Sequence, residues 1–181
     1  MCKSFKVVIV LALSYLLVAS SFAQHVGANF SYALVDKEPN HLHGYQLMFN
    51  YDPDKFKWRK FNVYFDAGIS HFGVSDYHQH RNINIYSIAP VVRYTFKPRG
   101  PFLPYLEFSI GLSYLSQTRL ANRNLGMHFA FQDRMGIGTL LGASKQLSIG
   151  MHAVHYSNAH LANHNGGITI PLVLDIGYQF N

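Results

Sequence analysis

The chain has 181 residues, of which 15% are aromatic and 13% are charged, with a formal net charge of +6 at pH 7. This length suits one domain, and the small positive surplus gives no argument for nucleic-acid binding. The single cysteine, Cys2, precedes the first apolar segment. The rest of the chain therefore excludes disulfides, thiolate catalysis and cysteine-ligated metals.

The N-terminal segment predicts a secretory signal peptide. Lys3 and Lys6 flank the start of an apolar run, and residues 21–23 (Ser-Phe-Ala) provide a small-x-small cleavage pattern. A retained membrane helix is the alternative, but the run is shorter than the ~20 residues that a spanning helix prefers. We expect removal of residues 1–23. The remaining domain, residues 24–181, loses two lysines, so its formal charge falls from +6 to +4.

The remaining chain alternates apolar and polar residues over about eight segments, and none of them is apolar for long enough to form a membrane helix. Few charges, many aromatics and an even number of strands favour an eight-stranded antiparallel transmembrane β-barrel. A soluble lipocalin-like barrel is the alternative, but the less apolar faces, rich in Ser, Gly, Asn and Thr, better suit a small polar interior. The expected strands are residues 26–36, 44–52, 58–74, 82–96, 102–117, 127–141, 146–158 and 168–180.

The last expected strand shows the alternation most clearly. Thr169 and Asp175 belong to its less apolar face. Its other face is apolar and ends in aromatics, which is typical of a lipid-facing strand that reaches the membrane interface. We expect this face to contact lipid along its whole length, through Ile168, Ile170, Leu172, Leu174, Ile176, Tyr178 and Phe180.

The connections alternate between compact turns and longer polar loops. The turns cover residues 52–55, 97–101 and 142–145, and the loops cover residues 37–43, 76–82, 117–126 and 160–167. Outer-membrane barrels have short periplasmic turns and longer external loops. We therefore expect an integral outer-membrane protein with both termini in the periplasm.

The strand expected at residues 146–158 carries a potential general base and a potential nucleophile, His155 and Ser157, two residues apart. Alternation places both on one face of the strand, where the imidazole can reach the hydroxyl. Their face also carries Ile149 and Met151, so we expect it to contact lipid. Polar groups against lipid are functional candidates. The alternative is an interfacial His and Ser wetted by lipid headgroups.

The segment from His155 to Ala159 (His-Tyr-Ser-Asn-Ala), followed by Asn165 and Gly167, resembles the signature of the lipid A 3-O-deacylases. Members of this family are small eight-stranded barrels of the Gram-negative outer membrane, with the active site on the outer wall. The resemblance implies that Ser157 is the nucleophile and His155 the base, and that lipid A of lipopolysaccharide is the substrate. It also implies that Asn158, Asn165 and Gly167 support the site or the oxyanion.

One position departs from the family. Thr169 stands where the family has its third catalytic residue, a glutamate, and a threonine supplies no carboxylate to the imidazole. If the preceding hairpin centres near Ser144, Asp133 lies directly across from His155, with a Cβ separation of about 5 Å. We therefore expect Asp133 to replace the glutamate. The alternative is that Asp133 pairs with Arg134 or with a basic group of a loop.

Eleven histidines raise the question of a metal site. His41 and His43, and likewise His78 and His80, form pairs on expected loops without matching carboxylate or thiolate clusters. We therefore expect neither a metal nor another cofactor.

The alternative function is a non-catalytic outer-membrane barrel that serves as a structural or surface-binding protein. Thr169 favours it, whereas the intact His155-x-Ser157-Asn158 pattern disfavours it. A pore is disfavoured because side chains fill the interior of an eight-stranded barrel. The sequence does not indicate an oligomeric state. Three arginines on the expected outer loops are candidates for binding lipid A phosphates, or are plain solvated charges: Arg81, Arg119 and Arg123.

Overall fold

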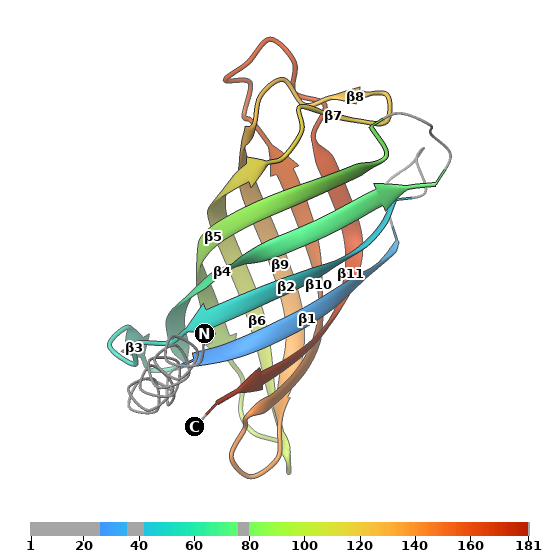
Figure 1. Ribbon diagram of the computed structural model, residues 1–181. Helices are drawn as coiled ribbons and strands as arrows, with labels where there is room; N and C mark the ends of the chain where they lie inside the picture. The colour runs from blue at the N-terminus through green and yellow to red at the C-terminus, as the bar shows by residue number, and fades with distance from the viewer. Residues whose placement is uncertain (1–25, 36–41, 76–79, 181) are drawn as a thin grey trace, which may run out of the picture.

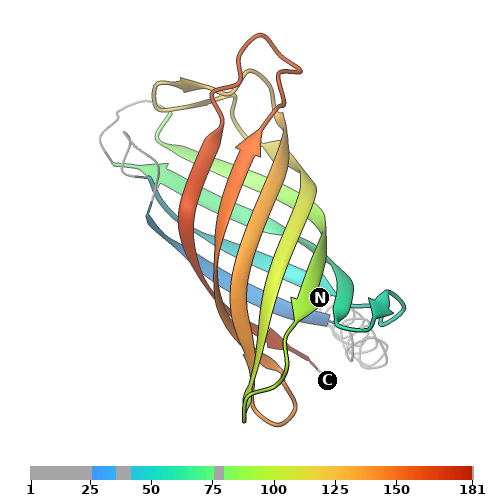
Figure 2. The ribbon, with the colours of Figure 1, turned by 180° about the vertical axis from the view of Figure 1, so that it is seen from behind.

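The computed structural model describes residues 26–35, 42–75 and 80–180, so the predicted signal peptide lies outside the described residues. Eight long strands wrap into a barrel (Figures 1 and 2). They are β1 (Val26–Val35), β2 (Leu42–Tyr51), β4 (Phe61–Val74), β5 (Asn82–Thr95), β6 (Phe102–Leu115), β9 (Phe129–Leu141), β10 (Leu147–Ser157) and β11 (Ile168–Gln179). Three two-residue strands lie in the connections: β3 (Lys57–Trp58), β7 (Arg119–Leu120) and β8 (Arg123–Asn124).

The sheet closes on itself. Each long strand pairs antiparallel with its neighbours, and the pairings of β1 with β11 and of β2 with β4 complete the ring. The predicted eight-stranded antiparallel barrel is therefore confirmed. Within the described residues there is no helix of the length and hydropathy needed to cross a membrane.

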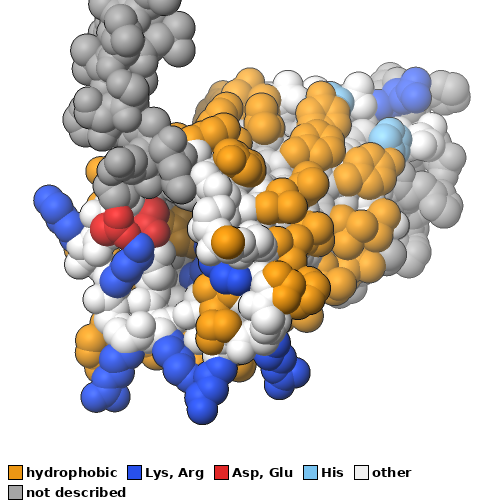
Figure 3. Space-filling view, turned by 90° about the horizontal axis from the view of Figure 1, so that it is seen from below, with side chains coloured by type: hydrophobic (Ala, Val, Ile, Leu, Met, Phe, Trp, Pro, Cys, Tyr) orange, Lys and Arg blue, Asp and Glu red, His pale blue; other side chains and the backbone are white. Residues whose placement is uncertain are grey.

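The two faces of the wall differ in the way that the alternation predicted. On β6, Phe108, Ile110 and Leu112 point outward and are about half exposed, whereas Ser109 and Ser113 are buried inside. Hydrophobic side chains cover much of the wall visible in Figure 3, and Lys and Arg side chains gather around the end nearest the viewer. An apolar outside and a polar inside are what a barrel needs in a membrane.

Charged side chains occupy the lumen in pairs. Arg93 on β5 lies 2.5 Å from Glu107 on β6, and Tyr64 on β4 donates a hydrogen bond of 2.7 Å to the same carboxylate. Arg134 on β9 pairs with Asp66 on β4. Burying a charge is tolerated when a partner and further hydrogen bonds compensate for the lost water.

One end of the lumen is apolar instead. A cluster of buried side chains from several strands fills this end of the lumen. It packs against the inner face of β10 in the C-terminal half of that strand. Val154 and Tyr156 belong to this cluster and alternate along β10 with the two candidate catalytic residues. The cluster also includes Phe72, Val74, Ile83, Ile85, Leu120, Leu125, Ile168 and Ile170.

The prediction that one apolar face of the last strand contacts lipid throughout is wrong for Ile168 and Ile170. Both are buried in the lumen, whereas Leu174, Ile176 and Tyr178 are exposed. Between the pairs His152–Val173 and Val154–Ile170, β11 contains one more residue than β10. This bulge reverses the alternation, leaves Leu172 half-buried and turns Thr169 outward. Pro171 lies within the bulge, where its missing N–H costs no ladder bond.

Short turns and long loops lie at opposite ends of the barrel. Val26 pairs with Tyr51 and Gly27 with Gln179, so both ends of the described chain lie at the end that carries the short turns. We call it the turn end. The other end, the loop end, carries β7 and β8 and the connection of residues 158–167, at the top of Figure 1.

Candidate active site

The register of three strands brings the candidate catalytic residues together near the loop end. On β10, His155 pairs with Asp133 of β9 on one side and with Thr169 of β11 on the other. Ser157, the last residue of β10, pairs with Phe131. The predicted position of Asp133 directly across from His155 is confirmed.

These side chains lie on the outer wall. Along β10, His152, Val154 and Tyr156 are at most 6% exposed and point into the lumen. His155 and Ser157 alternate with them and are half-buried, as are Asp133 and Thr169. The site therefore lies between the apolar cluster inside and the membrane outside.

His155 has one hydrogen-bond partner, and it is not the predicted one. Its Nδ1 lies 2.8 Å from the Thr169 hydroxyl oxygen. Among the described residues no side-chain hydrogen bond joins His155 to Asp133 or to Ser157. With Nδ1 occupied, Nε2 is the nitrogen that remains for Ser157, and a bond between catalytic groups often forms only in the substrate complex.

Asn158 fixes the loop that follows Ser157. Its side chain is 1% exposed and donates to the carbonyl oxygens of Leu125 (2.9 Å) and His164 (2.7 Å). Its Oδ1 accepts from the His160 N–H, and its own backbone N–H donates to Asn165 Oδ1, each at 2.9 Å. Both hydrogens of the Asn158 side-chain amide are donated to these carbonyls. The side chain therefore supports the loop and has no further N–H to donate to a substrate.

Gly167 forms the edge of the site next to His155. It has φ of +52°, which L-residues other than glycine rarely adopt. Its carbonyl oxygen accepts a hydrogen bond of 3.2 Å from Arg123 on β8. A hollow of about 10 Å³ beside it, lined in part by Ser157, Asn158 and Asn165, has room for roughly one water-sized group.

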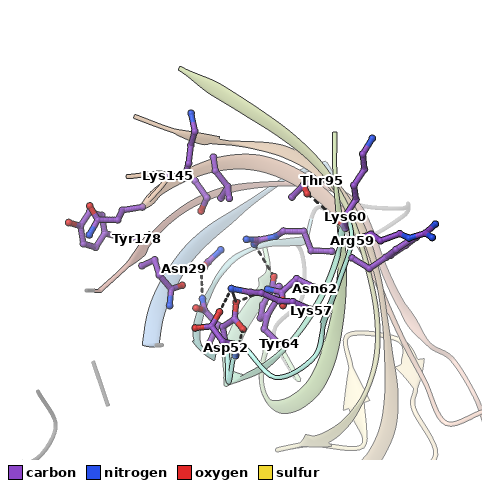
Figure 4. A pocket seen from close by; sticks show the side chains of 18 residues that line it. Asn29, Asp52, Lys57, Arg59, Lys60, Asn62, Tyr64, Thr95, Lys145 and Tyr178 are labelled. Carbon is purple, nitrogen blue, oxygen red and sulfur yellow. Dashed lines mark hydrogen bonds and ion pairs between the residues drawn. The ribbon is translucent and has the colours of Figure 1, made fainter. Parts of the chain in front are cut away.

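A second cavity, of about 370 Å³, opens at the turn end and is far from these residues along the barrel axis (Figure 4). Asp52 and Lys57 lie side by side in it, and Lys57 also pairs with Asp54. Partial burial opposes the charge of Lys57, but the two carboxylates prevail and raise its pKa.

The loop histidines form no metal centre where the structure describes them. Within residues 26–35, 42–75 and 80–180, no three His, Cys, Asp or Glu side chains gather closely enough to hold a metal ion. His41 and His78, one member of each histidine pair, lie outside the described residues.

The contact between Thr169 and His155 was not predicted. Strict alternation along β11 placed Thr169 on the lumen side, and the bulge reverses this. The available signal was Pro171, because proline inside a strand marks an edge or a bulge. Arg123, a candidate for binding lipid A phosphates, also donates a hydrogen bond to the Gly167 carbonyl oxygen, a contact that was not predicted.

Comparison with known proteins identifies the family. A model of the family described as "Lipid A 3-O-deacylase (PagL)" matches residues 42–178. The chain belongs to this family. The lipid A deacylase PagL of Pseudomonas aeruginosa PAO1 is 35% identical over 128 residues, covering 68% of this chain and 71% of that protein. The PagL protein of Bordetella bronchiseptica RB50 is 38% identical over 76 residues, or 42% of this chain and 41% of its own.

Solved structures agree with the PagL family in fold. The crystal structure of the outer-membrane enzyme PagL matches with a TM-score of 0.71 and 28% identity, over 84% of this chain and 98% of that one. The crystal structure of Neisserial surface protein A matches with a TM-score of 0.57 at 12% identity, over 86% of this chain and 96% of that one. The second match shows a shared fold and no more.

Proposed function

We propose that this chain is an outer-membrane serine esterase that removes the acyl chain ester-linked at the 3-O position of lipid A. The observation that carries the proposal is the outward placement of His155 and Ser157 on the wall of a barrel of the PagL family. Catalytic groups on the outer wall can act on a membrane lipid that stays in the bilayer. These two side chains lie in that position.

The proposed reaction uses Ser157 as nucleophile and His155 as general base. His155 Nε2 takes the Ser157 proton while the hydroxyl oxygen bonds to the ester carbonyl carbon. The bond between this carbon and glucosamine O3 then breaks, and His155 returns the proton to O3. A water molecule then attacks the acyl–serine ester while His155 takes its proton. His155 passes this proton to the Ser157 oxygen as the fatty acid leaves.

The oxyanion of the tetrahedral intermediate needs a donor, and Asn165 supplies one. Its Oδ1 accepts the Asn158 N–H, which fixes the amide, and its Nδ2 has no hydrogen-bond partner among the described residues. Both asparagines and Ser157 line the same hollow. One oxyanion donor typically contributes about 3 kcal/mol to the stability of the transition state.

The proposal assigns an orientation to the barrel. The loop end, with Ser157, faces the cell exterior, and the turn end with both termini faces the periplasm. The outward side chains below His155 on the same wall, Met151 and Ile149 of β10 and Met135 of β9, are 44%, 47% and 60% exposed. They form an apolar surface on which the acyl chain can lie without leaving the bilayer.

The test is Ser157→Ala in an outer-membrane preparation, followed by mass spectrometry of lipid A. We expect loss of the 3-O-deacylated species, with Ser144→Ala as the matched control, because Ser144 is an exposed serine of the 142–146 turn. Equal deacylation by Ser157→Ala and the native chain would remove Ser157 as nucleophile. No deacylation by either would favour a non-catalytic barrel.

A further inference from the structure

His155 stands between two side chains that each have part of the chemistry of a catalytic carboxylate. Thr169 on β11 has the contact, a hydrogen bond of 2.8 Å to Nδ1, but no charge. Asp133 on β9 has the charge and the register position, but its carboxylate has no hydrogen bond or ion pair with any described residue. The two flank His155 from opposite sides of β10.

The acid of a serine–histidine triad does two things. It accepts the imidazole N–H and so fixes the tautomer and the ring orientation, and its negative charge stabilises the imidazolium that forms during the reaction. The first task needs only a well-placed acceptor. The second needs a negative charge nearby, which is effective even without a direct hydrogen bond.

We propose that Thr169 and Asp133 divide these two tasks in this chain. Thr169 is a positioning residue that holds His155 in the tautomer with Nδ1 protonated and Nε2 available to Ser157. Asp133 supplies the negative charge from the neighbouring strand. This inference rests on the esterase activity proposed above.

Thr169 suits the positioning task because the backbone and its own side chain restrain it. The β11 bulge turns Thr169 onto the outer wall beside His155, where uninterrupted alternation would have turned it inward. A β-branched side chain has few χ1 rotamers, so the position of its hydroxyl is well defined. Gly167 lies on a further side of the imidazole ring. A Cβ built on this glycine would stand 3.3 Å from His155 Cε1.

Asp133 suits the electrostatic task because its described neighbours on the outer wall include no other cation. Its outward cross-strand neighbour on β6 is Ile110, and the next outward residue on its own strand is Met135, both more than half exposed. Arg134, the adjacent residue in sequence, points into the lumen and pairs with Asp66. A carboxylate among apolar side chains is stabilised by a nearby positive charge, and the imidazolium of His155 provides one.

The remaining ionisable groups near His155 lie on the loop end. Arg123 reaches the Gly167 carbonyl, and the loop of residues 158–167 carries His160 and His164. Asp133 is the acidic residue of β9, β10 and β11 that shares the outer wall with His155, because Asp175 of β11 bonds His152 within the barrel. Its removal therefore tests the charge directly.

The experiment measures fatty-acid release from lipid A in mixed micelles at a series of lipid A concentrations, using the full-length protein and its variants. Thr169→Val removes the hydroxyl at nearly constant shape and should lower kcat roughly 100-fold. Thr169→Ser should retain most of the rate. Asp133→Asn should lower kcat roughly 10-fold and leave KM unchanged, because the imidazolium that forms in the transition state loses a stabilising charge.

A double variant sharpens the test. In Thr169→Glu one side chain supplies both the acceptor and the charge, so adding Asp133→Asn should cost this variant a smaller fraction of its kcat than it costs the native chain. The division of tasks is wrong if Thr169→Val matches the native rate, or if Asp133→Asn leaves kcat unchanged in the native background. Each variant is first checked for native folding by its heat-dependent mobility in detergent gels.

An activity-free measurement separates this inference from the proposed function. Nitrogen-15 NMR of the His155 ring, assigned by comparison with His155→Gln, reports which nitrogen carries the proton. Thr169→Val should mix the tautomers, whereas Asp133→Asn should leave Nδ1 protonated. If Ser157→Ala shows that the esterase proposal fails, an unchanged tautomer in Thr169→Val would still refute the positioning role.

Discussion

Gly167 lies directly against the ring of His155, so that a Cβ added to this glycine would stand 3.3 Å from His155 Cε1 and 3.9 Å from Nε2. Gly167→Ala therefore pushes on the proposed base and places a side chain at φ of +52°. We expect deacylation to fall by roughly 10- to 100-fold, since small displacements of a catalytic group cost much of its rate. Lipid A mass spectrometry measures the loss.

Gly142→Ala is the matched control for this substitution. Gly142 has φ of +83°, and an added Cβ would meet nothing within 4 Å. It shares the backbone strain of Gly167→Ala but lies in a turn at the other end of the barrel. We expect Gly142→Ala to keep full activity and to lose a similar small amount of stability. If both variants lost activity equally, backbone strain alone would explain the effect of Gly167→Ala.

Asn158→Ala should loosen the loop that follows Ser157. The buried amide joins the carbonyls of Leu125 and His164 and the N–H of His160, and truncation leaves all three groups without this partner. An unsatisfied buried group costs about 1–3 kcal/mol. We expect faster proteolytic cleavage within residues 158–167 together with reduced activity. Asn163→Ala, at an exposed position of the same loop, should change neither.

Asp66→Ala should be the most destabilising of these changes. It leaves the Arg134 guanidinium inside the barrel without its carboxylate, and breaking a buried ion pair from one side costs about 3–5 kcal/mol. Urea unfolding in micelles measures the free energy of unfolding. Ser109→Ala removes a buried hydroxyl that has no partner among the described residues, so its free energy of unfolding should stay equal or rise.

The orientation of the barrel is open to cysteine labelling. The only native cysteine, Cys2, lies in the segment predicted to be removed, so an introduced thiol reports alone. We expect a membrane-impermeant maleimide to label Asn163→Cys at the loop end on intact cells, and to label Ser144→Cys at the turn end only after the outer membrane is opened. The reverse pattern would place the termini outside.

Much of the architecture could be predicted because a membrane barrel repeats one simple rule. Lipid on one side and a narrow lumen on the other demand strict alternation, and β6 follows it through Phe108, Ser109 and Ile110 without interruption. The same regularity allowed the pairing of Asp133 with His155 to be derived from the centre of one hairpin. Pairing register follows from counting residues when the intervening ladder has no bulge.

What could not be predicted depends on departures from that rule. The bulge in β11 moved Ile168 and Ile170 into the lumen and brought Thr169 out to His155. A bulge arises from local backbone geometry and from packing on both faces, neither of which alternation records. The hydrogen bonds of Asn158 were equally hidden, because two of its partners are backbone groups distant in sequence or across a loop.

If Ser157 is the nucleophile, its place on the outer wall determines how an acyl ester reaches it. A substrate confined to the leaflet arrives by sliding sideways through neighbouring lipids, and the freed fatty acid departs along the same plane. Turnover in such a two-dimensional solvent scales with the mole fraction of the target lipid around the barrel rather than with its amount per volume. Spreading the same protein through a larger area of inert lipid would therefore slow it while every bond within the site stayed intact.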